Sequence, residues 1–237
     1  MKKPNQSVDF SRRNLLKFSA GAIGTGILAS GVGSKLAFPQ PAVAHNEMSP
    51  KDALQRLMEG NQRFVNRIAK NPRRDIVRMA EVATSQKPFA AILGCADSRV
   101  PAEIVFDQGF GDLFVCRVAG NVATPEEIGS LEYGTLILEA KVLMVMGHER
   151  CGAVTATLKG GEVPGQIGSL INAIKPAISR SENQTGDQLE NTCKANVLLQ
   201  IENLLSSPVI AQLVEEEKLK IVGGYYDLDT GEVSLVS

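Results

Sequence analysis

Short apolar runs alternate with amphipathic stretches along most of this chain, and this alternation predicts an α/β fold. Five runs predict strands, at 89–94, 112–118, 141–146, 219–226 and 232–236. The last two flank the turn signal Asp229-Thr230-Gly231, so the final strand is expected to return antiparallel to the strand before it. We therefore predict a mostly parallel sheet of four strands with an antiparallel edge strand and helices on both faces.

Helical periodicity fills the intervals between the strands and the stretch that precedes them. Ser49-Pro50 marks the first helix, because a capping serine is followed by proline at the first helical position. Gly60-Asn61 is a candidate interruption of that helix. The N-terminal helices have few strands of their own to cover, so we predict an N-terminal helical arm that packs on a partner subunit. The predicted helices are 50–68, 76–84, 124–138, 167–179, 190–205 and 208–217, with short helical pieces at 101–106 and 151–158.

The first 44 residues form a separate segment. Arg12-Arg13 is the paired arginine typical of a twin-arginine export signal, and a weakly apolar stretch follows at Phe18–Val32. Ala42-Val43-Ala44 is a small-x-small cleavage site. We predict that 1–44 is a cleaved export signal and that 45–237 is a single domain, exported to the periplasm or, in a photosynthetic bacterium, to the thylakoid lumen. The alternative is an uncleaved anchor, but the apolar stretch is short and glycine-rich for a stable membrane span, so no stable membrane anchor is expected after cleavage.

Removal of this segment changes the charge of the chain. The 237 residues carry 25 Lys and Arg, 26 Asp and Glu, and a formal net charge of −1. Six of the basic residues and one of the acidic residues lie in 1–44, so the rest of the chain has 19 basic and 25 acidic residues and a net charge of −6. A mildly acidic domain argues against binding to nucleic acid or to anionic membrane surfaces.

Two polar motifs come directly after two of the predicted strands. They are Cys95-Ala96-Asp97-Ser98-Arg99 and His148-Glu149-Arg150-Cys151. Strand ends in an open α/β sheet meet in one crevice, so two thiolates and one imidazole can come together there. Three protein ligands leave one tetrahedral position open, as in catalytic rather than structural zinc sites. We predict one Zn²⁺ per subunit, held by Cys95, His148 and Cys151.

Asp97 and Arg99 are the predicted catalytic neighbours of this site. Arg99 can hold the Asp97 carboxylate through a bidentate pair, which turns the carboxylate away from the metal and toward a hydroxide bound there. Alternatively, Asp97 can swing onto the zinc as a fourth ligand, which would exclude water and stop the chemistry. The residues themselves leave both states open.

The remaining two cysteines lack such a context. Cys116 lies in an apolar strand, where a buried thiol is expected, whereas Cys193 lies among polar residues and is expected to be exposed. A disulfide between them is the alternative in an export compartment. The sequence has no Cys-x-x-Cys motif, which disfavours a dithiol redox function.

Several further motifs resemble those of the β-class carbonic anhydrases, and the resemblance extends over essentially all of 45–237. It implies reversible hydration of carbon dioxide to bicarbonate and a proton by zinc-bound hydroxide, with the three ligands above and an Asp97–Arg99 dyad. It also implies a homodimer or tetramer with active sites at the subunit interface. The motifs are Ala53-Leu54, Gly60-Asn61, Arg63-Phe64, Cys95-Ala96-Asp97-Ser98-Arg99-Val100-Pro101, Gly111-Asp112-Leu113-Phe114, Arg117-Val118-Ala119-Gly120-Asn121, Ser130-Leu131-Glu132-Tyr133 and Gly147-His148-Glu149-Arg150-Cys151-Gly152.

The resemblance also suggests residues that contact the substrate. Gln86 matches a glutamine that hydrogen-bonds the substrate in the plant-like branch, and Phe114 and Tyr133 match an apolar pocket there. An ordinary place in the core is the alternative for these two rings. Another branch, regulated by bicarbonate, has a tryptophan where this chain has Ile92, and the chain has no tryptophan at all. We therefore expect an open site at neutral pH.

Two other functions use the same residues. A hydrolase of carbonyl sulfide or carbon disulfide needs the same metal chemistry on a similar linear molecule, and fold-level similarity does not separate these reactions. A catalytically silent zinc protein would result if Asp97 closed the site permanently.

Overall fold

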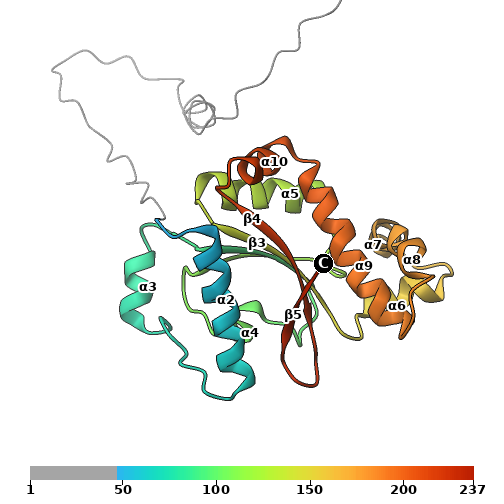
Figure 1. The fold of residues 1–237 in the computed structure, drawn as a ribbon, viewed down its shortest axis with the longest axis horizontal. Coiled ribbons are helices and arrows are strands. Elements are labelled where there is room, and N and C mark those ends of the chain that lie inside the picture. Colours follow the sequence, from blue (N-terminus) through green and yellow to red (C-terminus); the bar gives the residue numbers. More distant parts are fainter. Residues whose placement is uncertain (1–46) are drawn as a thin grey trace, which may run out of the picture. The chain divides into compact units, whose positions relative to one another are not determined.

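The computed structural model describes residues 47–237, so the predicted export signal at 1–44 lies outside the described residues. A five-stranded sheet with the order β2-β1-β3-β4-β5 forms the centre of this part (Figure 1). The first four strands pair in parallel, and β5 pairs antiparallel with β4. The predicted sheet is therefore confirmed. The strands are β1 Ala90–Gly94, β2 Leu113–Arg117, β3 Val142–His148, β4 Lys220–Tyr226 and β5 Val233–Val236.

Helices cover both faces of this sheet, with α2 and α4 over one face and α9 over the other (Figure 1). No single helix in 47–237 is long and apolar enough to cross a membrane, although α9 and α10 together, with a 94° bend between them, pass that test of length and composition. The helices are α2 Pro50–Val65, α3 Ile76–Val82, α4 Ala102–Val105, α5 Pro125–Glu132, the π-helical turn η1 Tyr133–Ile137, α6 Gly152–Lys159, α7 Ile167–Ile174, α8 Pro176–Ser181, α9 Gln188–Leu205 and α10 Pro208–Glu215.

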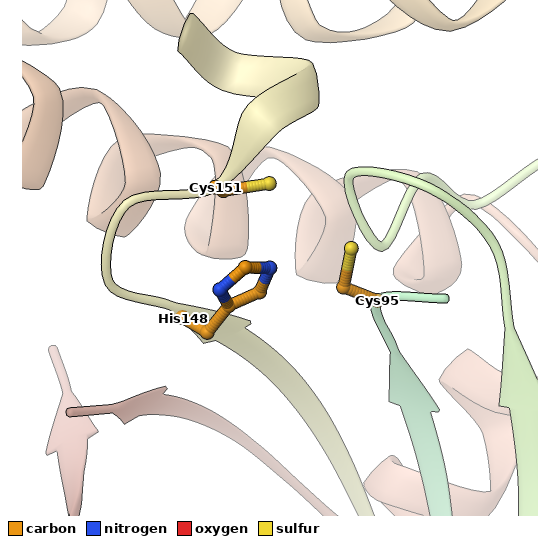
Figure 2. A group of neighbouring side chains, drawn as sticks. All are labelled: Cys95, His148 and Cys151. Carbon is orange, nitrogen blue, oxygen red and sulfur yellow. The ribbon is translucent and has the colours of Figure 1, made fainter. Parts of the chain in front are cut away.

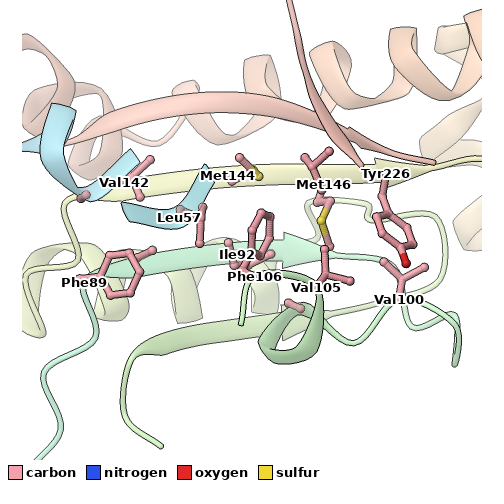
Figure 3. Close-up of a cluster of buried hydrophobic side chains, with 14 residues drawn as sticks. Leu57, Phe89, Ile92, Val100, Val105, Phe106, Val142, Met144, Met146 and Tyr226 are labelled. Carbon is pink, nitrogen blue, oxygen red and sulfur yellow. The ribbon is translucent and has the colours of Figure 1, made fainter. Parts of the chain in front are cut away.

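Strands β1 and β3 are buried along their whole length, which explains why their sequences are almost continuously apolar. Alternate residues of each strand point to opposite faces. Ile92 of β1 and Met144 of β3 contribute to the cluster under α2, which adds Leu57 to it (Figure 3). This core holds the carboxyl ends of β1 and β3 side by side, with Gly94 opposite Met146.

The expected interruption of the first helix at Gly60-Asn61 is wrong, because α2 runs through both residues. They instead make close contacts between α2 and two distant parts of the chain. A Cβ atom on Gly60 would lie 1.9 Å from the carbonyl oxygen of Phe106, so only glycine fits there. Asn61 donates from Nδ2 to the carbonyl of Gly231 at 2.8 Å and accepts from the backbone N–H of Val233 at 2.9 Å, which ties α2 to the β4–β5 hairpin.

The N-terminal helices were predicted to have few strands of their own to cover. For α2 this is wrong, because Ala53 and Leu57 bury that helix against its own sheet. The shorter α3 behaves differently, since it buries no residue. Its apolar side chains Ile76, Val77 and Met79 are more than half exposed. Packing of this arm on a partner therefore stays a prediction for α3.

Two other expected helices are divided. The helix predicted over 167–179 breaks into α7 and α8 at Pro176, which has no N–H to continue the hydrogen-bond ladder. The helix predicted over 124–138 changes from α5 to the π-helical turn η1, where the N–H of Leu138 reaches back to the carbonyl of Tyr133. Gly134 in that turn packs against the Phe114 ring, from which a Cβ atom would be only 2.7 Å away.

A buried carboxylate joins the segment after α2 to the loop after α4. Asp107 accepts a hydrogen bond from Arg63 Nε at 2.7 Å and from the backbone N–H groups of Lys70 and Asn71 at 3.0 and 2.8 Å. Burial opposes its ionisation, but these donors outweigh that effect and hold the pKa of Asp107 below its ordinary value. The carboxylate therefore stabilises the fold when it is ionised.

Replacing Asp107 with asparagine should lower the free energy of unfolding by about 1–3 kcal/mol at neutral pH, because buried donors lose part of their acceptor. The pKa is depressed in the folded state, so this contribution is present above about pH 4 and is lost as the pH falls further. Urea unfolding at several pH values measures it, with Glu215→Gln as an exposed control. A destabilisation that does not shrink below about pH 4 would contradict the assignment.

Candidate metal centre

Cys95, His148 and Cys151 come together where the parallel strands β1 and β3 end. Cys95 directly follows β1, His148 is the last residue of β3, and Cys151 is the N-cap of α6. The two strands are parallel neighbours, so their carboxyl ends reach the same edge. Figure 2 shows the two sulfur atoms and the imidazole turned toward one another.

These three side chains offer a compact and buried set of ligand atoms. The ligand atoms all lie within 4.8 Å of one another. The residues are only 4%, 0% and 1% exposed, in chain order. Two sulfurs and one imidazole nitrogen form a donor set that suits zinc, and three protein ligands leave a position for a fourth.

The imidazole is oriented by its own backbone neighbour. Nδ1 of His148 lies 2.8 Å from the carbonyl oxygen of Glu149. Because a carbonyl only accepts, the proton belongs on Nδ1, and Nε2 carries the lone pair. Nε2 is buried and has no hydrogen-bond partner among the described residues. A buried nitrogen that faces two thiols without a partner fits a metal ligand, and the Nδ1 contact is the support that such ligands usually have.

The two thiols differ in how easily they ionise. Hydrogen bonding from Cys151 lowers the pKa of Cys95 to about 4, and the backbone N–H of Gly120, which donates to the Cys95 sulfur at 3.3 Å, acts in the same direction. The same contact with Cys95, together with burial, raises the pKa of Cys151. A divalent metal ion needs both as thiolates, so metal binding would release a proton from the pair.

Asp97 lies beside this group but is held by Arg99. Nε of Arg99 donates to Oδ1 at 2.9 Å, and a terminal nitrogen donates to Oδ2 at 2.7 Å. Hydrogen bonding to Arg99 keeps the pKa of the Asp97 carboxyl well below its usual range. Oδ2 of Asp97 is 3.9 Å from Nε2 of His148, so the carboxylate borders the ligand set. This bidentate pairing is the arrangement expected for an open site.

Arg117, at the end of β2, is a supporting residue that the local sequence does not predict. Its Nε donates to the carbonyl of Cys95 at 2.9 Å, and its terminal nitrogen donates to the carbonyl of Asp97. Arg117 thus fixes the backbone that carries both a candidate ligand and the carboxylate. The sequence feature that could point to this role is a single charged residue at the end of an apolar strand.

Cys193 was expected to be exposed, and this is wrong. It is 2% exposed and belongs to the same buried cluster as Cys95 and Cys151. Burial raises its pKa to about 12. The polar neighbours of Cys193 in the sequence indicate an exposed position, but α9 turns several polar side chains inward. Cys116 is half-buried, and all four cysteines are free thiols, so the alternative of a disulfide between Cys116 and Cys193 is also wrong.

Within one chain, the predicted substrate contacts lie away from the strand ends that carry this metal centre. Gln86 is exposed in the loop that precedes β1, whereas Cys95 follows that strand. Phe114 and Tyr133 do lie together, with ring centroids 6.4 Å apart. Phe114 pairs with Ala91, however, four residues before Cys95. Tyr133 is 48% exposed and Phe114 half-buried, so these two rings form a partly open apolar surface at the edge strand.

Comparisons with known proteins agree with this geometry. The family model described as carbonic anhydrase matches residues 90–233. The chain is 38% identical over 196 residues to a carbonic anhydrase of Mycolicibacterium smegmatis, covering 80% of this chain and 94% of that protein. It is 36% identical over 192 residues to carbonic anhydrase 2 of Mycobacterium tuberculosis, covering 79% and 93%.

Solved structures give the same result. A β-carbonic anhydrase of Coccomyxa in complex with acetazolamide superposes with a TM-score of 0.63 at 27% identity, covering 77% of this chain and 86% of that chain. A tetrameric β-carbonic anhydrase of Sordaria macrospora shares the fold with a TM-score of 0.64 at 22% identity, covering 78% and 98%. The chain belongs to the carbonic anhydrase family, in its β class.

Proposed function

We propose that this protein catalyses the reversible hydration of carbon dioxide to bicarbonate and a proton, with one zinc ion per subunit. The observation that carries the proposal is the buried Nε2 of His148, which has no hydrogen-bond partner among residues 47–237 and faces the sulfurs of Cys95 and Cys151, with Asp97 beside it. The relatives that cover most of the chain are named carbonic anhydrases, which supports the reaction.

The zinc ion, held by Cys95, His148 and Cys151, would supply Lewis acidity that makes water a nucleophile near neutral pH. Two thiolates neutralise the formal charge of the ion and weaken this effect, so the surrounding groups have to contribute. Asp97 does so as an acceptor. Its carboxylate stays ionised because Arg99 grips both oxygens, and it can take a hydrogen bond from the attacking oxygen and orient that oxygen's lone pair.

The Asp97–Arg99 pair also opposes the silent state, in which Asp97 would close the site. To reach the metal, the carboxylate would have to give up two hydrogen bonds to the Arg99 side chain and one to its backbone N–H at 2.9 Å. The bidentate pair therefore favours the open arrangement.

Gln86, Phe114 and Tyr133 would act from a second subunit. Gln86 lies at the opposite end of β1 from Cys95, so it cannot serve the site of its own chain. The exposed edge of β2 with the Phe114–Tyr133 pair supplies an apolar surface of the kind that accepts a small nonpolar molecule. A homodimer, alone or paired into a tetramer, would join this surface and the amide of Gln86 to the neighbouring metal centre.

Two substitutions distinguish the role of the metal from the role of the Asp97 carboxylate. Cys151→Ser should lose most of its zinc and its activity, because one of three ligands is gone. Asp97→Asn should keep its zinc while kcat/KM for carbon dioxide hydration falls by about 10²–10⁴-fold. Stopped-flow assays and zinc analysis measure both, with Cys116→Ser as the control cysteine.

A parallel assay on carbonyl sulfide tests the hydrolase alternative. Efficient carbonyl sulfide hydrolysis with negligible carbon dioxide hydration would overturn the proposed reaction.

Full carbon dioxide hydration activity in Asp97→Asn would overturn the assigned role of the carboxylate.

Mixed oligomers test whether Gln86 acts across the interface. Gln86→Ala and Asp97→Asn should each be weakly active alone. Refolding or coexpressing them together should restore about a quarter of wild-type activity, since about half the dimers are mixed and each has one complete site. No gain on mixing would show that Gln86 does not act from the partner, because a mixed dimer then contains no complete site.

We also propose that residues 1–44 direct export and are removed, which would place the activity in the periplasm or the thylakoid lumen. The paired arginines at Arg12-Arg13 and the small residues before His45 support this. N-terminal sequencing of the protein from an extracytoplasmic fraction should begin near His45, and Arg12→Lys with Arg13→Lys should retain the full-length chain in the cytoplasm. Recovery of the uncleaved wild-type chain from the cytoplasm would contradict it.

A further inference from the structure

One face of α9 is polar and yet completely buried. Thr192, Cys193, Asn196 and Gln200 are 0%, 2%, 0% and 0% exposed. Their spacing places the last three on one stripe of the helix. A core-facing stripe is ordinarily apolar, so this one has to be hydrogen-bonded within the protein.

The stripe is held at a fixed position on the sheet. Val197 fits over two glycines of neighbouring strands, where a Cβ atom on Gly147 or Gly223 would lie 2.6 or 2.8 Å from its methyl groups. Gly147 directly precedes His148. The close contact therefore places the polar face of α9 over the strand end that carries the metal centre.

The polar stripe clamps the loop that follows β2. Nδ2 of Asn196 donates to the carbonyl of Gly120 at 2.8 Å. Gln200 donates from Nε2 to Oδ1 of Asn196 at 2.9 Å and accepts from the backbone N–H of Ala123 at 2.9 Å. The loop is thus fixed at two points, and Gln200 holds Asn196 in place.

Gly120 is the point at which this clamp meets the candidate metal centre. Its φ is +77°, in the left-handed region, and a Cβ atom there would lie 2.5 Å from the side chain of Ile174. While its carbonyl accepts from Asn196, its N–H donates to the sulfur of Cys95 at 3.3 Å. One residue therefore connects α9 to a candidate ligand.

We propose that Asn196, supported by Gln200, is a positioning residue of the metal centre that directs the Gly120 N–H onto the Cys95 sulfur. The inference rests on the zinc site of the proposed function. A hydrogen bond to a thiolate orients it and withdraws electron density, so the sulfur donates less charge to the metal. In a site with two thiolates, that withdrawal helps to preserve the Lewis acidity of the ion.

Two readouts on the full oligomer test this inference without using turnover. In Asn196→Ala, the zinc dissociation constant, measured by competition with a chelator, should rise by about 10–100-fold, because the loss of a fixed sulfur position outweighs the greater charge that the sulfur can donate. After cobalt substitution, the sulfur-to-cobalt charge-transfer band should move to lower energy, because a thiolate without its hydrogen bond gives up charge more easily.

Thr192→Val is the matched control. Thr192 is on the same helix and equally buried, but its hydroxyl bonds to Ser181 and Gln188, away from the Gly120 loop. It should lose comparable stability while zinc affinity and the cobalt band keep their wild-type values. Should Asn196→Ala fail to fold, Gln200→Met is measured in its place, and both readouts should shift in the same direction.

A folded variant with wild-type zinc affinity and an unchanged cobalt band would overturn the inference, and so would an equal shift in Thr192→Val. A wild-type protein that binds zinc without hydrating carbon dioxide refutes the proposed function alone, since the same variants still decide the role of Asn196.

Discussion

The parallel pairing of β1 with β3 is the constraint on which the metal centre depends. Its register places Gly94 opposite Met146, so Cys95 emerges beside the end of the strand that carries His148. A slip of one residue would turn His148 to the other face of the sheet, since side chains alternate along a strand. The buried apolar residues of both strands fix the register, and the core thereby determines where the ligands meet.

The polar groups around this edge divide into two kinds. Those that orient the centre are satisfied within the protein: Nδ1 of His148 by a carbonyl, Asp97 by Arg99, and the Gly120 carbonyl by Asn196. Nε2 of His148 is left without a partner among the described residues. An unsatisfied buried nitrogen is costly, so a metal ion bound there would stabilise the folded chain as well as serve chemistry.

Much of this arrangement follows from local sequence. The strands and the two ligand motifs are recognisable because apolar runs and the residues directly after them are contiguous in the chain. The inward orientation of Cys193 and the support from Arg117 depend on contacts between distant segments, which periodicity does not reveal. The role of Gly60-Asn61 was missed for the same reason, because its partners lie after β4 and before β2. The position of Gln86, at the far end of β1, becomes informative only once the strand direction is known.

X-ray absorption at the zinc edge of the purified oligomer tests the central claim most directly. The account predicts stoichiometric zinc with two sulfur neighbours at about 2.3 Å, one imidazole nitrogen at about 2.0–2.1 Å and one further light atom. A protein that contains no stoichiometric transition metal, or a metal shell without sulfur, would contradict it.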